Sequence, residues 1–163
     1  MPSEVELLEV FRLAEAAGLD GIATAASARL VWSWLGMSRF HDTRDLTRRT
    51  LAVQPFPHPD TLQAAGRAAQ SLGEPDQALG YFTQALAILR QVGDRAGEAV
   101  TRYNIAMIQR ARGNLVEAVA ELEQVVELDR QVQHPDLESD TRMLQQIREE
   151  LRLMNPDAAV QSP

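Results

Sequence analysis

An internal repeat is the feature that most limits how this chain can fold. Residues 72–91, LGEPDQALGYFTQALAILRQ, align with residues 112–131, RGNLVEAVAELEQVVELDRQ, at an offset of 40 positions. The matching apolar positions are Ala78 with Ala118, Phe82 with Leu122, Ala85 with Val125, and Leu86 with Val126. Upstream, Gly66 aligns with Ala106, so each copy places a small residue twelve positions before its Ala. Self-similarity at this period predicts stacked helical pairs, in which small residues let two helices approach closely.

The rest of the chain also predicts helices and no strands. Apolar residues recur with helical spacing, and Gly and Pro fall between these stretches. An N-terminal helix over 3–18 begins with a capping box of Ser3 and Glu6. The further predicted helices cover about 22–36, 41–53, 59–72, 75–91, 95–112, 115–131 and 136–153. The sequence therefore predicts an all-α fold.

Length and charge narrow the classes of function. A chain of 163 residues with 45% hydrophobic residues is typical of one globular domain or a short repeat array. The net charge of −7 argues against direct nucleic-acid binding, which needs concentrated positive charge. No apolar run approaches the roughly 20 residues that span a bilayer, so no membrane partner is expected. The absence of cysteine excludes disulfides and thiolate sites, and we predict a cytoplasmic protein.

No residue pattern predicts catalysis or a bound cofactor. The three histidines are scattered, no Ser or Cys nucleophile lies in a turn signature, and no Gly-rich phosphate loop is present. His41 and Asp42 are adjacent, but the sequence offers no Ser or Cys nucleophile that such a pair could activate. No two histidines share a helix face, as a metal site would need. We expect no enzyme, with no catalytic residues, no metal site and no cofactor.

Residues 58–153 resemble the long tetratricopeptide repeats (TPRs) of kinesin light chain and of bacterial signalling regulators. The resemblance rests on an H-P-D opening, an Asn before an apolar–Ala pair, and an Ala-rich second helix. These motifs read His58-Pro59-Asp60, His134-Pro135-Asp136, Tyr103-Asn104-Ile105-Ala106 and Gln84-Ala85-Leu86-Ala87-Ile88. The resemblance implies a right-handed superhelix, or α-solenoid, of antiparallel helical hairpins.

The H-P-D stretches have a second interpretation, because the same three letters mark the J-domain cochaperones. Neither copy here follows a basic helix, and both precede the first helix of a pair. Pro presets the backbone for a first helical turn, and Asp beside it favours the positive end of the helix. We therefore interpret both copies as helix starts.

The resemblance also sets the expected domain boundaries. One TPR domain over 1–155 contains about three repeats, and a flanking helix covers each end because a solenoid must not expose its apolar core. The expected segments are the N-terminal helix 3–18, the repeats 24–57, 59–98 and 99–138, the capping helix 139–153, and a disordered tail over 156–163.

The first helices of TPR pairs line a concave groove, and the resemblance implies which side chains point into it. The predicted peptide-binding residues are Arg29, Trp32, Gln63, Arg67, Gln70, Tyr103, Asn104, Met107 and Arg110. Asn104 resembles the asparagine with which long TPRs bind a peptide backbone. One Arg from each repeat, Arg29, Arg67 and Arg110, is expected to converge in this groove.

These residues predict a non-enzymatic protein-interaction module. A basic groove with aromatic residues favours a peptide that carries an acidic group or a carboxylate together with an apolar anchor. All 16 basic residues are Arg, which either reflects codon use in a GC-rich genome or selection for bidentate carboxylate recognition.

Two other functions stay open from the sequence. The chain could be a structural or oligomerisation module, forming a homodimer through the C-terminal helix face of Leu144, Ile147 and Leu151 or through the Thr-rich first repeat. It could also be the sensory TPR region of a larger bacterial transcriptional or signalling regulator.

Overall fold

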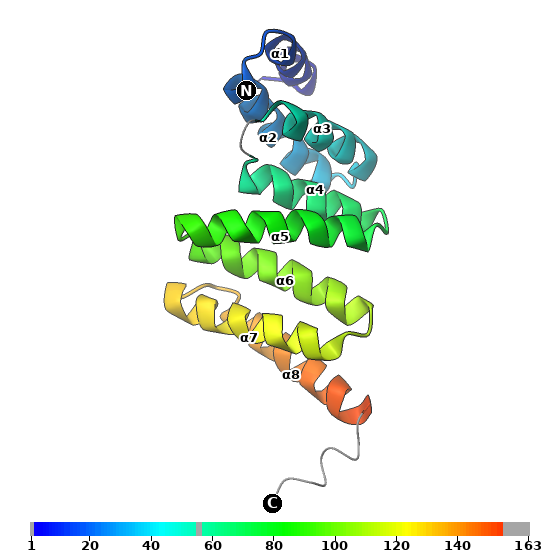
Figure 1. Ribbon diagram of the computed structural model, residues 1–163, viewed down its shortest axis with the longest axis vertical. Coiled ribbons are helices and arrows are strands. Elements are labelled where there is room, and N and C mark those ends of the chain that lie inside the picture. The colour runs from blue at the N-terminus through cyan, green and yellow to red at the C-terminus, as the bar shows by residue number, and fades with distance from the viewer. Residues whose placement is uncertain (1, 55–56, 155–163) are drawn as a thin grey trace, which may run out of the picture. The chain divides into compact units, whose positions relative to one another are not determined.

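The computed structural model describes residues 2–54 and 57–154, which form eight helices and no strand (Figure 1). The helices are α1 (Glu4–Ala16), α2 (Asp20–Gly36), α3 (Phe40–Val53), α4 (Pro59–Ser71), α5 (Pro75–Val92), α6 (Arg95–Ala111), α7 (Leu115–Val132) and α8 (Leu137–Met154). This confirms the all-α prediction, and the expected tail over 156–163 lies outside the described residues. Among the described helices, none has both the length and the apolar character that crossing a membrane requires.

Both His-Pro-Asp stretches lie at helix starts. The Nδ1 atom of His58 accepts a hydrogen bond from the backbone N–H of Asp60 at 3.3 Å, and Pro59 is the first residue of α4. In the same way, the Nδ1 atom of His134 accepts from the backbone N–H of Asp136 at 3.2 Å, just before α8. The prediction that these motifs start helices is therefore confirmed.

Six helices end in the same backbone bend. In the bend after α4, the N–H of Glu74 donates to the carbonyl of Ala69 at 2.9 Å and that of Gly73 to Gln70 at 3.1 Å, which is a Schellman motif. The bends have positive φ at positions 18 and 38, and again at 73, 93, 113 and 133, so they recur every 20 residues within each of these two runs, which are 35 residues apart. Four of them carry Gly, whereas Ser38 and Gln133 adopt the left-handed conformation at a steric cost.

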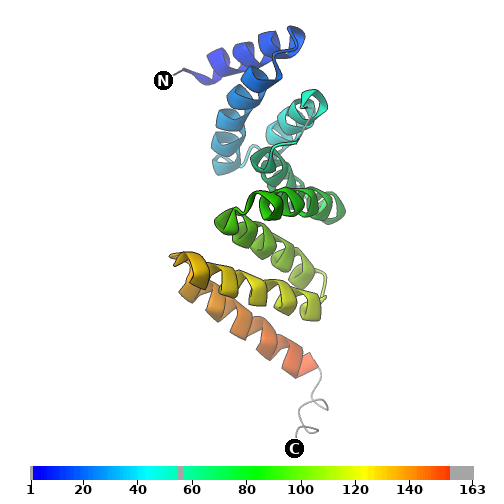
Figure 2. The ribbon, with the colours of Figure 1, turned by 60° about the vertical axis from the view of Figure 1, so that its left-hand side comes forward.

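The chain divides into two compact units, residues 1–85 and 86–163, with the division inside α5. In the first unit α1 packs against α2, α2 against α3, and α3 against α4 (Figure 2). The core cluster around α1, α2 and α3 contains Phe11, Leu30, Val31, Trp34 and Leu46, all at most 4% exposed.

Gly66 of α4 lies directly against the ring of Phe82 of α5. A Cβ atom added at Gly66 would lie 2.8 Å from the Cε1 atom of Phe82, well inside van der Waals contact. Phe82 is completely buried, so its ring has little room to move away. The small residue of the repeat over 59–98 therefore does what its spacing predicts, which is to let two helices approach.

Three threonines of α3 are buried in the first unit. Thr43, Thr47 and Thr50 are at most 1% exposed. Their hydroxyls donate to the carbonyls of Arg39, Thr43 and Leu46, each at 2.9 Å within the same helix. These side chains are not on the surface, so the prediction that a Thr-rich face of this repeat mediates association is wrong.

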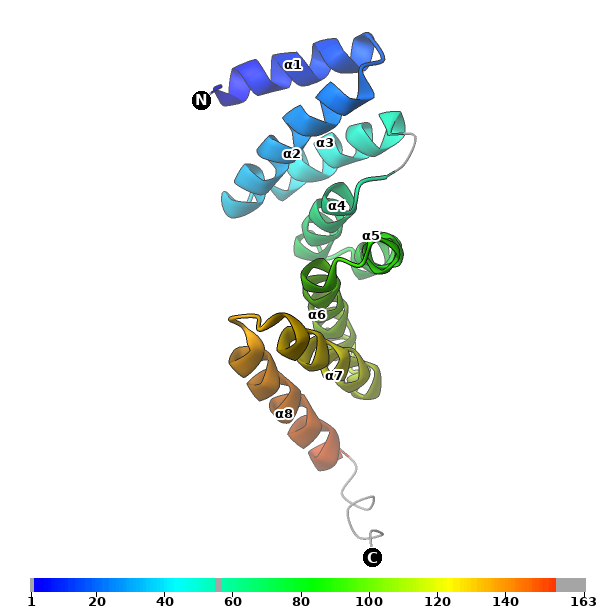
Figure 3. The same ribbon diagram turned by 90° about the vertical axis from the view of Figure 1, so that its left-hand side faces the viewer.

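In the second unit α6 packs against α7, and α7 packs against α8 (Figure 3). Leu144 and Ile147 of α8 are 5% and 0% exposed, and Leu151 packs against the same core cluster. The apolar face of the last helix is therefore already covered within the unit. Leu144 and Ile147 are therefore not open for a homodimer, and association through the C-terminal helix stays a prediction.

A buried ion-pair network joins the end of α5 to α6 and α7 in the second unit. Glu98, 4% exposed, accepts from Arg90 and Arg102 at 3.1 Å each and from Arg95 at 3.4 Å. Arg102, 5% exposed, donates on to Glu121 at 2.5 Å. Burial raises the pKa of Glu121, and the charge of Arg90 opposes that rise.

Candidate functional site

The predicted peptide-binding residues lie on three helices and in both units. Arg29 and Trp32 lie on α2, Arg67 lies on α4 with Gln63 and Gln70, and the other four lie on α6. The helices α2 and α4 belong to the first unit and α6 to the second. Arg29 and Arg67 lie in one unit and Arg110 lies in the other, so their convergence in one groove stays a prediction.

The first unit brings Trp32 and Arg67 together. The guanidinium carbon of Arg67 lies 5.5 Å from the centre of the Trp32 ring, which is a cation–π contact between α4 and α2. Trp32 is 38% exposed, Arg67 is exposed, and Arg29 is an exposed neighbour one turn earlier on α2. A cation and an aromatic face are thus presented side by side at the surface of this unit.

Gln63 departs from the prediction, because its side chain is only 8% exposed. Nearly all of α4 is enclosed, and the small residues Ala64, Ala65 and Ala68 are at most 2% exposed. A helix enclosed this tightly leaves few side chains open, and Arg67 is one of them. Gln63 is therefore a buried residue rather than part of an open surface, and Gln70 is half-buried.

Arg110 is held by the last helix. Its Nε atom donates to one carboxylate oxygen of Glu150 at 3.1 Å, and its Nη2 atom donates to the other. Its Nη1 atom contacts the sulfur of Met143 at 3.2 Å. The hydrogen bonds from Arg110 lower the pKa of Glu150. Sequence reasoning missed this pairing, because the two residues are 40 positions apart.

The other predicted residues of α6 are also engaged within the second unit. Tyr103 and Met107 are half-buried and pack against the core cluster to which α8 contributes. Burial raises the pKa of Tyr103, and the nearby charge of Asp140 adds to the rise. The side-chain amide of Asn104 donates to the carbonyl of Val100 at 2.9 Å in its own helix. The α6 residues are therefore less accessible than Trp32 and Arg67.

Two carboxyl groups face each other where α7 meets α8. Asp129 is 1% exposed, and its Oδ2 atom has no hydrogen-bond donor. Burial, and next a hydrogen bond to Asp129, raise the pKa of Asp140 to about 6. Within residues 2–54 and 57–154, no three His, Asp or Glu side chains lie close enough together to hold a metal ion. The Asp140 carboxyl therefore holds its proton more tightly beside Asp129 than it would in water.

Clefts occur beside helices that the sequence did not single out. One of about 490 Å³ lies in the first unit and is lined by Val5, Leu8, Glu9 and Arg12 of α1 and by Arg49 of α3. Another of about 290 Å³ in the second unit is lined by Gly113, Asn114, Leu115, Val116, Glu117, Leu151 and Met154. Neither cleft includes a predicted peptide-binding residue. The repeat pattern carries no signal for them, because it describes only the contacts between helices.

Comparison with known proteins identifies the repeats. The family model described as tetratricopeptide repeat matches residues 59–131. The type III secretion translocator chaperone SycD of Yersinia enterocolitica has a similar fold, with a TM-score of 0.69 at 15% identity over 80% of this chain and 86% of that chain. A Podosopora anserina protein described as a kinesin light chain with nearly identical TPR-like repeats has a TM-score of 0.65 at 20% identity, over 84% and 74%. A search of curated protein sequences finds no match.

Proposed function

Residues 59–131 match the tetratricopeptide repeat model, and from this premise we propose that the chain is a non-enzymatic module that binds a peptide segment of a protein partner. The proposed ligand carries an acidic group or a free carboxylate next to an apolar side chain. The fold is one that presents helix faces to other proteins, and SycD, which is named as a chaperone, uses the same fold. A bacterial source and a cytoplasmic location are part of the same proposal.

The observation that carries this proposal is the exposed pair of Trp32 and Arg67 in the first unit. A guanidinium binds carboxylates through two parallel hydrogen bonds, and an indole face buries an apolar side chain. Arg67 is fixed over the ring, so both groups are oriented before a ligand arrives. We therefore centre the ligand site on Arg29, Trp32, Arg67 and Gln70.

The contact made by Arg110 supports the same ligand chemistry. This side chain already binds a carboxylate, that of Glu150, together with the thioether of Met143. A helix of the chain thus supplies the combination of acid and apolar group that we propose for the ligand. Since α8 occupies this position, we expect the first unit to contribute more to affinity than α6.

Fluorescence anisotropy with a labelled peptide would test the proposal. The probe is an acidic hexapeptide with one Phe and a free C-terminal carboxylate, compared with a version in which Lys replaces the acidic residues. We expect Arg67→Ala and Trp32→Ala each to weaken binding about 10-fold, as the loss of one charge-assisted or aromatic contact does. Asn104→Ala should weaken binding less, since its amide is bonded within α6.

Arg142→Ala provides the matched control for that measurement. Arg142 is 70% exposed and makes only a loose pair with Glu138, at 3.8 Å. Its removal should change neither the peptide affinity nor the melting temperature. Equal binding by wild type, Arg67→Ala and Trp32→Ala would overturn the proposed site, and equal binding of the Lys-containing peptide would overturn the ligand chemistry.

A further inference from the structure

The two terminal helices present different outer faces. From Glu138 to Arg152 the exposed residues of α8 are polar, and only the last two residues of this helix, Leu153 and Met154, are exposed and apolar, at 66% and 67%. The polar ones are Glu138, Ser139, Arg142, Gln145, Gln146, Arg148, Glu149 and Arg152. In α1, by contrast, Val5 and Leu13 are 75% and 52% exposed. A terminal helix of a repeat array normally has a polar outer face, which keeps the array from associating. The outer face of α1 does not meet this requirement.

The exposed apolar residues of α1 form a stripe with two charges at its centre. We call Val5, Glu9, Arg12, Leu13 and Ala16 the α1 stripe, because their spacing places them along one face of the helix. All five are exposed. Arg12 donates to Glu9 at 2.9 and 2.7 Å, so the acidic and basic groups lie together between the two apolar ends.

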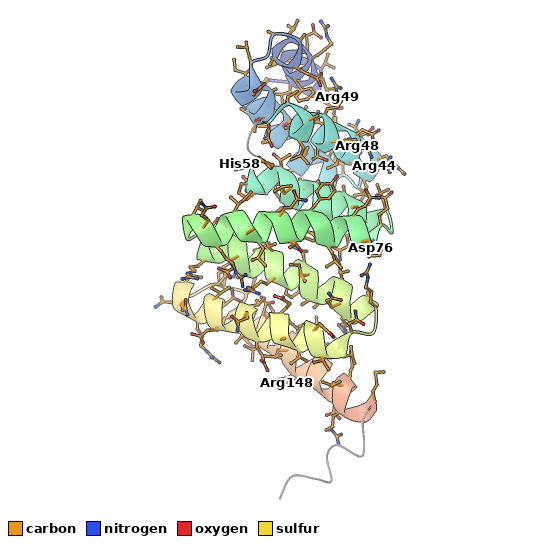
Figure 4. The ribbon with its side chains drawn as sticks, viewed as in Figure 1. Arg44, Arg48, Arg49, His58, Asp76 and Arg148 are labelled. Carbon is orange, nitrogen blue, oxygen red and sulfur yellow. The ribbon has the colours of Figure 1, made fainter. Side chains whose placement is uncertain are left out.

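The cleft of about 490 Å³ borders this stripe. Its α1 wall includes Val5 and Leu8, and Arg49 of α3 closes the other side. Arg49, labelled in Figure 4, is held in place. Its side chain donates to the carboxylate of Glu15, and its guanidinium carbon lies 4.9 Å from the centre of the Phe11 ring. The hollow therefore has a fixed wall and an apolar floor, which suits an apolar side chain entering from outside.

The α1 stripe is complementary to itself when it is reversed. If two copies of α1 pack antiparallel about a two-fold axis between positions 9 and 12, Glu9 of each copy faces Arg12 of the other. The same axis places Val5 against Ala16, and Leu13 against Leu8 at the floor of the cleft. One register thus satisfies both charges and both apolar ends.

We propose that the α1 stripe and the adjoining cleft form the interface of a homodimer, with the occupant being α1 of a second copy of this chain. The charge pattern favours this occupant, because Glu9 and Arg12 pair within α1 and a reversed second copy offers each of them an opposite charge across the axis as well, which a partner of a single sign does not. The α1 stripe shares no residue with the Trp32 and Arg67 site. The proposed dimer therefore does not depend on the proposed peptide binding.

Charge reversal across the axis provides the test. The full chain of 163 residues is studied by sedimentation equilibrium at about 5 to 500 µM, since one helix face is small and should give a dissociation constant on the order of 10 µM. Glu9→Arg alone and Arg12→Glu alone should each weaken dimerisation at least 10-fold, because each places like charges opposite one another. A 1:1 mixture of the two variants should form a heterodimer of about wild-type affinity.

The chain contains a matched control on α8. Glu149 and Arg152 have the same spacing and pair at 2.6 Å, with side chains 53% and 58% exposed. Glu149→Arg should leave dimerisation unchanged. Leu13→Ser removes the apolar group without adding a charge, and it should weaken dimerisation at least 10-fold. This variant tests the interface even if a charge variant folds poorly.

Three outcomes would overturn the proposal. The first is a monomer over the whole concentration range. The second is a dimer that is insensitive to Glu9→Arg, Arg12→Glu and Leu13→Ser, because association would then use another surface. The third is a failure of the mixed variants to associate although each single variant is impaired, since opposite charges across the proposed interface should restore binding.

Discussion

The two recognised repeats solve the same packing problem with different pairs of residues. In the first unit Gly66 lies against Phe82, and 40 positions later Ala106 and Leu122 occupy the equivalent places in the second. All four positions are buried, and Phe82, Ala106 and Leu122 are 0% exposed. A larger side chain on one helix is accompanied by a smaller one on the other. The combined volume, rather than either residue, is what the helix contact requires.

The units differ more in how they satisfy buried polar groups. In the first, the hydroxyls of Thr43, Thr47 and Thr50 bond only to carbonyls of their own helix. In the second, Glu98 and Arg102 depend on each other. Local satisfaction makes a polar residue replaceable by an apolar one, whereas mutual dependence leaves a buried charge behind when one partner is removed.

The largest loss of stability is expected when the buried pair of Glu98 and Arg102 is broken. Arg102→Ala should lower the free energy of unfolding by about 3 kcal/mol, because the buried Glu98 then keeps only the exposed Arg90 and Arg95, and Glu121 also loses its donor. Thr47→Val in the first unit should change it by less than about 1 kcal/mol, since its hydroxyl serves only its own helix. Urea denaturation of both variants measures the contrast. Equal losses would mean that the two units do not differ in this respect.

A smaller effect is expected at the small-residue position. Gly66→Ala should cost about 1 to 2 kcal/mol, because strain against the Phe82 ring outweighs the helical gain from Ala. The double variant Gly66→Ala with Phe82→Leu recreates the pair of the second unit and should recover most of the loss. Thermal melts of the single and double variants measure both steps, and an additive loss in the double variant would contradict the compensation.

The smallest effect is a pH dependence confined to the second unit. The pKa of Asp140 is raised from 3.8 to about 6, so the folded chain holds this proton more tightly than the unfolded chain does. Stability from this group is therefore present below about pH 4 and is lost as the pH rises through about 6.

Asp140→Asn should remove that loss, because an amide can donate to the unpartnered Oδ2 atom of Asp129 at every pH. A shift of about two units corresponds to about 3 kcal/mol, and since Asp140 is partly exposed we expect solvent screening to reduce the gain at pH 7.5 to about 1 kcal/mol. Unfolding curves at pH 4 and 7.5 check this. Glu138→Gln, 86% exposed in the same turn, is the control, and a gain that is equal at both pH values would contradict the assignment.

The features that sequence predicted well are those with a local cause. The helices, the helix start at His58-Pro59-Asp60 and the close approach at Gly66 follow from spacing and from residue chemistry within one or two helical turns. The contact of Arg110 with Glu150 does not follow from local spacing, because it depends on how α8 packs against α6. The burial of Gln63 was missed for the same reason, since position on a helix face does not reveal how deeply the helix is enclosed.

The regular bends carry a consequence for how such a chain can grow. Positive φ recurs at 73, 93, 113 and 133, so one helix together with its bend forms a module of 20 residues that always ends in the same way. A gene segment that encodes one such module can be copied or deleted while every remaining helix keeps its own ending. Evolution can therefore change the length of the array in whole modules, whereas the gain or loss of one residue inside a helix would turn the following face by about 100°.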